Sequence, residues 1–223
     1  MVDSGAAPEA LLRYLSVLKP AAVGDLLKDT AGIAELIAPA RFPPARWPSR
    51  GSHPVVTLQQ AAVNAARAEF AGDRQGILAV NGPPGTGKMP LLRDLVAHCV
   101  ESRAARLVEF DDPNKAFIPT GQKFQVGDGE FLHLHGLDPR IKGFEVLVAS
   151  SNNKAVENVS RELPSGRSIE PGPRYFAATA RALLYGEERN FPADPADHPW
   201  GLMAAALGNS RNRRDFRQRF WLH

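Results

Sequence analysis

A glycine-rich segment that ends in lysine is the part of this 223-residue chain best suited to chemistry. Residues 82–88 read Gly-Pro-Pro-Gly-Thr-Gly-Lys. Because glycines have no Cβ atom, backbone N–H groups in such a loop can converge on the oxygens of a phosphate chain. The lysine ammonium adds a positive charge for the β- and γ-phosphates. The pattern predicts a site for the phosphates of ATP, formed by consecutive residues: Gly82, Pro83, Pro84, Gly85, Thr86, Gly87, Lys88 and Met89.

Met89 departs from the usual pattern, which has Ser or Thr directly after the lysine. That hydroxyl is a ligand of Mg²⁺, and a thioether is too soft to replace an oxygen on this hard cation. ATP can still bind through the backbone and Lys88, whereas hydrolysis depends on the metal to neutralise developing charge. We therefore expect ATP binding with a weakened contribution from Mg²⁺, and weak or absent hydrolysis.

The segments on either side of the loop fit this interpretation. Residues 76–81 are apolar and predict a buried strand that runs into the loop. Apolar residues after the loop recur at helical spacing, and Pro90 is tolerated only in a first turn, so a helix is expected to begin near Lys88. The dipole of that helix would favour a bound phosphate. The alternative is a glycine-rich turn that binds no ligand.

A second polar segment follows another apolar run. Residues 144–150 predict a strand, and residues from about 153 onward predict a helix with an inward apolar face. Side chains at the end of a strand in an open α/β sheet are well placed to bind ligands, and Ser and Asn can donate to phosphates. The candidate residues are Ser151, Asn152 and Asn153. An ordinary helix N-cap at Ser151 or Asn152 would explain the same residues.

Three segments resemble, in order, the motifs of superfamily-one helicases. Residues 58–63 (Leu-Gln-Gln-Ala-Ala-Val) are similar to the Q motif, residues 82–88 to motif I, and residues 148–159 to motif Ia. The resemblance implies that Gln59, with Gln60 as the adjacent candidate, reads the adenine of ATP. It also implies that Ser151, Asn152 and Asn153 contact the backbone of single-stranded nucleic acid, either DNA or RNA.

The resemblance covers roughly residues 55–165 and implies a fold. We expect an α/β fold, the RecA-like parallel sheet of a P-loop NTPase flanked by helices, which is incomplete and preceded by a small helical element. The expected domains are a helical N-terminal element (1–38), a Pro-rich linker (39–54) and a partial RecA-like domain (55–223). An insertion at about 104–143 is too long for an ordinary connection and is expected to hold its own hairpin.

The later motifs of the family are not seen after motif Ia. In the family they supply the Asp-Glu pair for Mg²⁺ and water, the Gln and Arg sensors, and a second RecA-like domain. The chain is accordingly interpreted as the N-terminal part of a helicase, with the remainder of the helicase or another chain as a partner.

Other segments give weaker signals. A strand is expected before Asp111 and Asp112, which could be metal ligands at its end or simply form a turn, and the pair His133 and His135 lacks a convincing third ligand. The C-terminal run 211–221 has five arginines interleaved with aromatic residues. It fits either a phosphate-tracking surface or an amphipathic helix whose apolar side chains packed on the missing remainder of the helicase.

Composition sets broader limits. A net charge of +3 mildly favours anionic partners, and 43% hydrophobic residues are ordinary for a globular protein. Cys99 is the one cysteine, so no intramolecular disulfide can form. No apolar stretch has the length of a membrane span, and the N-terminus lacks a signal-peptide pattern. We expect a cytoplasmic protein with no membrane partner.

Three functions remain open at this point. The first is an ATPase fragment of a superfamily-one helicase that acts on nucleic acid. The second is a non-hydrolysing module that binds nucleotide or nucleic acid, in which Met89 has ended catalysis. The third is an inactive remnant whose exposed sheet edge needs a partner chain.

Overall fold

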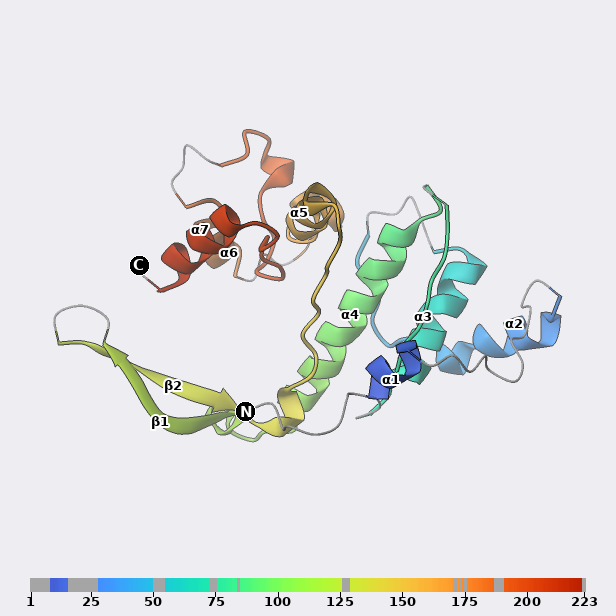
Figure 1. Cartoon of the computed structure of the whole chain (residues 1–223), viewed down its shortest axis with the longest axis horizontal. Coiled ribbons are helices and arrows are strands. Elements are labelled where there is room, and N and C mark those ends of the chain that lie inside the picture. The colour runs from blue at the N-terminus through green and yellow to red at the C-terminus, as the bar shows by residue number, and fades with distance from the viewer. Residues whose placement is uncertain are drawn as a thin grey trace. The chain divides into compact units, whose positions relative to one another are not determined.

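A computed structural model describes residues 9–15, 28–49, 55–72, 76–83, 85–125, 129–170, 172, 174, 176–186 and 191–221. The chain divides into two compact units, and each is described here by itself. The first unit comprises Met1–Arg46 and Pro54–His98, and the second comprises Trp47–His53 and Cys99–His223. Helices dominate both units (Figure 1).

The first unit is built around helix α3 (Thr57–Glu69). Its other elements are α1 (Glu9–Leu15), α2 (Thr30–Leu36), the 3₁₀ turn η1 (Pro39–Arg41) and the beginning of α4 (Lys88–Leu107). One side of α3 is buried, and two polar residues on that side are tied into a chain. The Gln60 amide donates to Asn64 Oδ1 at 2.9 Å, and the Asn64 amide donates to the Leu36 carbonyl at 2.7 Å. These bonds anchor the end of α2 to α3.

Two arginines fix the proline-rich segment of this unit. Arg67 of α3 donates to the carbonyl of Arg41 at 2.6 Å. Arg46 pairs with the buried carboxylate of Asp94 in α4, with Nη2 and Oδ2 3.2 Å apart. The segment that follows α2 is therefore bonded to both α3 and α4, although its described residues form no helix or strand after η1.

A tryptophan pair organises the second unit. The Trp47 and Trp200 rings meet edge to face, with centroids 6.0 Å apart and planes at 78°. Both indole N–H groups are satisfied, because Trp47 donates to the Ser168 carbonyl at 2.7 Å and Trp200 to the Leu163 carbonyl at 2.9 Å. Buried indoles need such partners. The two rings thereby hold the chain around residues 163–168 against residues 47 and 200.

The same unit contains a β-hairpin and a group of helices. Strand β1 (Phe117–Gln125) pairs antiparallel with β2 (Phe131–Leu137), and the register shifts between Pro119 and Lys123. The hairpin predicted within 104–143 is thus confirmed. The helices, together with the remaining 3₁₀ turns, are as follows: η2 (Pro113–Ala116), η3 (Pro139–Ile141), α5 (Asn153–Glu162), η4 (Gly166–Ser168), α6 (Ala177–Tyr185), η6 (Pro195–Asp197) and α7 (Ser210–Trp221).

The predicted parallel RecA-like sheet is wrong. In the part of the chain that the structure describes, the sheet consists of β1 and β2 alone, and they are antiparallel. Residues 76–81 and 144–150 form neither helix nor strand. Leu147 is 91% exposed and Val80 is 45% exposed, so neither segment has the buried setting of a central strand. An apolar run satisfies the pattern of a strand, but a strand also needs hydrogen-bonded neighbours, and these two segments have none in β1 or β2.

The expected strand before Asp111 and Asp112 is also wrong. Residues up to Leu107 belong to α4, and Val108 and Glu109 form the turn that ends it. The side chain of Asp112 accepts a hydrogen bond from the Asn114 N–H at 2.9 Å and so caps η2. This supports the simpler interpretation of Asp112 as a turn residue.

Candidate functional site

The glycine-rich loop has the backbone conformation that its glycines allow. Gly85 has φ +82° and Gly87 has φ +76°, in the left-handed region that is costly for residues with a Cβ atom. Helix α4 begins at Lys88, directly after the second of these glycines, as the sequence predicted. Pro84 lies outside the described residues. Two glycines with left-handed backbone conformation thus lie just before a helix N-terminus.

The side chains of Lys88 and Thr86 close the loop on itself. Lys88 Nζ donates to the carbonyls of Gly82 and Pro83, at 2.5 and 2.8 Å. Thr86 Oγ1 also donates to the Pro83 carbonyl, at 2.8 Å. The ammonium group therefore lies within the loop, where it is bonded to neutral carbonyl oxygens. Lys88 and Thr86 are both exposed, so a ligand can reach them from solvent.

Gln59 is brought to the loop from the first turn of α3. Its Nε2 donates to the Thr86 carbonyl at 2.8 Å, and its Oε1 accepts from the Val56 N–H at 3.0 Å. A Cβ atom on Gly87 would lie 2.1 Å from Gln59 Nε2, so the contact is close. Gln60 is only 4% exposed and is bonded to Asn64, which makes it part of the packing of α3.

The start of α4 offers donors to an anion. The first N–H groups of a helix have no intrahelical acceptor, and their dipoles add to a partial positive charge. Pro90 has no N–H, so the N–H groups of Lys88 and Met89 are the donors nearest the loop. The Met89 side chain is half-buried in this first turn. The arrangement can bind an anion, and the residue at position 89 contributes no oxygen ligand.

The three polar residues predicted from motif Ia lie at the start of α5 in the second unit. Asn152 is the N-cap, and its Oδ1 accepts from the N–H groups of Lys154 and Ala155 at 3.0 and 3.4 Å. The Ser150 hydroxyl accepts from the Asn152 N–H at 3.1 Å. The capping function considered for Asn152 is thus confirmed. Ser151, Asn152 and Asn153 are all exposed.

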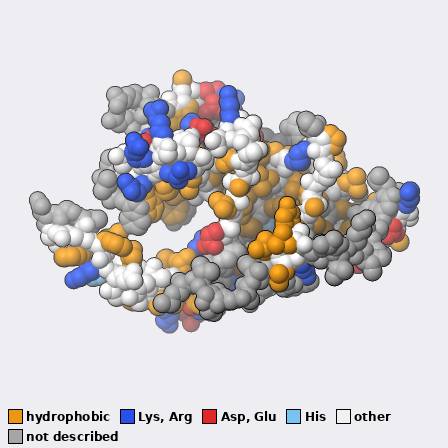
Figure 2. Space-filling model, in the orientation of Figure 1, with side chains coloured by type: hydrophobic (Ala, Val, Ile, Leu, Met, Phe, Trp, Pro, Cys, Tyr) orange, Lys and Arg blue, Asp and Glu red, His pale blue; other side chains and the backbone are white. Residues whose placement is uncertain are grey.

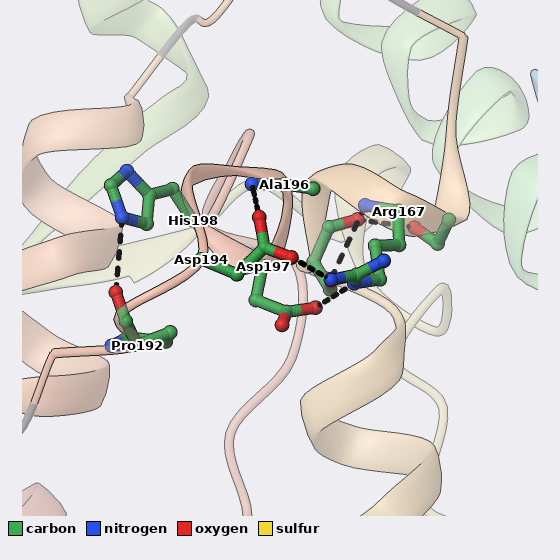
Figure 3. Close-up of polar contacts among 8 residues, drawn as sticks. Arg167, Pro192, Asp194, Ala196, Asp197 and His198 are labelled. Atoms are coloured by element: carbon green, nitrogen blue, oxygen red, sulfur yellow. Dashed lines mark hydrogen bonds and ion pairs between the residues drawn. The ribbon is translucent and has the colours of Figure 1, made fainter.

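A separate charged cluster in the second unit is structural (Figure 3). Arg167 binds Asp197 through Nε, with 2.6 Å between Nε and Oδ1, and its Nη2 pairs with Asp194. The Ala196 N–H donates to Asp194 at 2.9 Å, and this bond together with the Arg167 charge holds the pKa of Asp194 below its usual value. A ring nitrogen of His198 lies 3.2 Å from the Pro192 carbonyl. These groups join η4 to η6, so their charges serve the fold.

The sequence did not reveal a cavity between α5, α6 and α7. It has a volume of about 560 Å³, and its wall includes Arg161, Tyr185, Arg211 and Phe216. These residues come from three helices that are far apart in the sequence, so no local pattern could show that they meet. The arginine-rich run at 211–219 was the one signal that pointed to this region.

The described ranges contain neither a metal-binding cluster nor a membrane-spanning helix. No group of three His, Cys, Asp or Glu side chains there could hold a metal ion. His135 Nδ1 lies 3.2 Å from the carbonyl of His133 on β2, and both side chains are exposed. Among the described helices, none combines the length and the apolar character needed to cross a membrane.

Comparisons with protein-family models, with curated proteins and with solved structures found no match.

Proposed function

We propose that this chain binds ATP through residues 82–88, as the nucleotide-binding part of a superfamily-one helicase-like ATPase with weak or absent hydrolysis. One observation carries the proposal. Two glycines in left-handed conformation lead directly into a helix whose first residue is a lysine with its ammonium in the loop. Left-handed glycines, a helix N-terminus and a lysine are the parts from which phosphate-binding loops are built.

Phosphate oxygens would take over the hydrogen bonds that now close the loop. Lys88 Nζ is bonded to the carbonyls of Gly82 and Pro83, which are neutral acceptors. Hydrogen bonds from the ammonium to phosphate are stronger than its bonds to carbonyls, so exchanging the carbonyls for phosphate oxygens favours ATP binding. The N–H groups at the start of α4 add further donors. Gln59, bonded to the Thr86 carbonyl, lies beside this site and is the residue proposed to meet the adenine.

Weak hydrolysis follows from the residue at position 89. An oxygen ligand from this position helps to hold Mg²⁺ in ATPases of this type, and the Met89 thioether cannot supply it. The metal neutralises charge that develops on the phosphates during transfer. ATP is therefore bound mainly by Lys88 and the backbone, and its cleavage is slow.

The experiment is a calorimetric ATP titration of the full chain and of Lys88→Ala. Loss of a hydrogen bond to a charged group costs about 1.5–3 kcal/mol, so affinity should fall about 10- to 150-fold. Lys115→Ala is the matched control, because Lys115 is an exposed lysine in η2. ATP binding that is equal in the parent and in Lys88→Ala would show that the loop is not the site.

A second candidate function is binding of single-stranded nucleic acid, and α7 favours it. Four arginines of this helix are exposed, namely Arg211, Arg213, Arg214 and Arg217. Figure 2 shows Lys and Arg side chains gathered over the region where Figure 1 labels α6 and α7. Guanidinium groups are well suited to phosphate, and Phe216 and Phe220 stack in the same helix with centroids 5.7 Å apart.

Salt dependence tests the nucleic-acid proposal. Affinity for a single strand should fall by about 0.7 decade per decade of salt for each phosphate that is neutralised. Replacing Arg214 and Arg217 by Gln should reduce that slope, since both side chains are exposed. A signal that does not change with salt, or no binding at low salt, would remove nucleic acid as a partner.

A further inference from the structure

The cavity between α5, α6 and α7 has the size and the wall of a ligand site. Its volume of about 560 Å³ lies within the range of small-molecule pockets, about 300–1,000 Å³. Part of the wall is apolar and packed, because Pro164 and Leu183 are buried. The remaining wall is mostly polar and includes two aromatic residues. Such a combination binds a ligand with a flat apolar part and a charged part.

Two of the three arginines in the wall are already engaged. Arg161 pairs with Glu157 one turn earlier in α5, with 2.8 Å between nitrogen and oxygen. Arg219 donates through Nη1 to the carbonyls of Leu183 and Leu184, at 3.4 and 2.8 Å, and so joins α7 to α6. Both groups add positive charge to the cavity wall, and Arg219 also holds α7 against α6.

Arg211 is the cation best able to accept a new partner. Its side chain is 88% exposed, and its ion pair with Asp215 is long, with Nε and Oδ2 3.9 Å apart, beyond hydrogen-bonding distance. Three guanidinium groups stand in the wall with the two carboxylates of Glu157 and Asp215, so the excess charge is positive. A planar guanidinium at the rim of a pocket is suited to bind phosphate through two parallel bonds.

Two aromatic rings in the wall offer contact to a flat group. Phe216 stacks on Phe220 with planes at 18°, and Tyr185 meets Phe191 edge to face with centroids 5.3 Å apart. Both Tyr185 and Phe216 line the cavity. Burial raises the pKa of Tyr185, so its hydroxyl stays protonated at neutral pH. Aromatic side chains of this kind stack on nucleobases of any sequence.

The amides of Asn209 and Asn212 complete the polar wall. The backbone N–H of Asn212 donates to Asn209 Oδ1 at 2.8 Å, which fixes the side-chain amide of Asn209 at the start of α7. Asparagine amides form paired hydrogen bonds with the edges of bases, and carboxylates accept from exocyclic amino groups. The cavity thus contains side chains that can bind a nucleobase, and Arg211, which can bind a phosphate.

We propose that this cavity binds one nucleotide unit, with the base against Tyr185 and Phe216 and the phosphate on Arg211. It is a second site, formed by residues other than the loop 82–88, and it does not depend on ATP binding there. The unit is either a free mononucleotide or one residue of a single strand, since both present the same base and phosphate. In the second case the cavity supplies base contacts to the nucleic-acid binding proposed for α7.

The test uses the full chain carrying Lys88→Ala, which removes the loop lysine from the measurement. AMP and UMP are titrated by calorimetry, and a fluorescent single-stranded oligonucleotide is titrated beside the same strand with one abasic position. Each titration is repeated with Arg211→Gln added, and with Arg174→Gln added as the control. Arg174 is an exposed arginine that neither lines the cavity nor belongs to α7.

The expected result is that Arg211→Gln weakens binding about tenfold, as for the loss of one charge-assisted contact, while Arg174→Gln has a smaller effect. If Arg211→Gln weakens the binding of AMP or UMP, the ligand is a free mononucleotide. If it weakens only the binding of the oligonucleotide, and the abasic strand binds less tightly than the intact strand, the ligand is one residue of a strand. Equal effects of Arg211→Gln and Arg174→Gln in every titration would overturn the proposal. Phe216→Leu, which removes the ring, should abolish the preference for the intact over the abasic strand.

Discussion

Gly87→Ala should impair ATP binding more than Gly85→Ala, and the difference should depend on Gln59. Both glycines have positive φ, so alanine at either position strains the loop by about 1–2 kcal/mol. A Cβ atom on Gly85 would meet no heavy atom within 4 Å. A Cβ atom on Gly87 would lie 2.1 Å from Gln59 Nε2, so the Gln59 side chain must move.

The magnitudes follow from these contacts. If the bound loop requires the left-handed conformation, strain alone lowers ATP affinity about 5- to 30-fold, which is the expectation for Gly85→Ala. Displacement of Gln59 also breaks its 2.8 Å bond to the Thr86 carbonyl. A net loss of about 0.5–1.5 kcal/mol for that bond weakens binding a further 2- to 12-fold in Gly87→Ala.

The assay is a double-mutant cycle measured by calorimetric ATP titration. Each glycine variant is prepared in the parent chain and in Gln59→Ala, where the side chain that would clash is absent. In Gln59→Ala the two glycine variants should have equal effects, because backbone strain is then the only cost. A difference between Gly87→Ala and Gly85→Ala that persists in Gln59→Ala would refute the proposed contact. Equal effects in the parent chain would refute it as well.

Three other predictions address the metal, acid stability and the thiol. Met89→Thr should strengthen ATP binding in the presence of Mg²⁺ and leave binding in chelator unchanged, because it adds one oxygen ligand; calorimetry with each buffer would detect the difference. The pKa of Asp194 is lowered in the fold, so its stabilising effect is present above the ordinary value of 3.8 and is lost as the pH falls through the lower folded-state value. Asp194→Asn should therefore unfold at lower urea than the parent near neutral pH, and the gap should close in acid; a gap independent of pH would contradict this. Burial raises the pKa of Cys99, so iodoacetamide should alkylate the folded chain more slowly than the urea-unfolded chain at mildly alkaline pH, as followed by mass spectrometry. Equal alkylation rates would show that the thiol is not shielded.

Local features of the fold could be predicted from the sequence. The helix start at Lys88 follows from a glycine before it and Pro90 within its first turn. The hairpin β1–β2 was expected from the length of the segment between the helix that follows the glycine-rich loop and the next predicted strand. The cap at Asn152 follows from the short polar side chain before an apolar helical pattern. For the helix start and the cap, the determining residues lie within a few positions of the feature.

Features that depend on distant residues could not be predicted. The apolar runs 76–81 and 144–150 predict strands, but pairing is decided by other segments, and here the residues of these runs stay largely exposed. The bond from Gln59 to Thr86 joins residues 27 positions apart. The family resemblance implied that Gln59 and the loop bind the same nucleotide, but it did not imply a hydrogen bond between them. The cavity between α5, α6 and α7 needs three helices to meet, which no pattern within one helix reports.

The most direct test of ATP binding at residues 82–88 is a calorimetric titration of the full chain with ATP, performed once with Mg²⁺ and once with a chelator. Saturable binding is expected in both buffers, because Lys88 and the first N–H groups of α4 bind phosphate without a metal. The difference between the two affinities should be small, since Met89 offers no oxygen to the ion. Absence of binding in both buffers would contradict the proposed function, and binding that requires Mg²⁺ would contradict the role assigned to Met89.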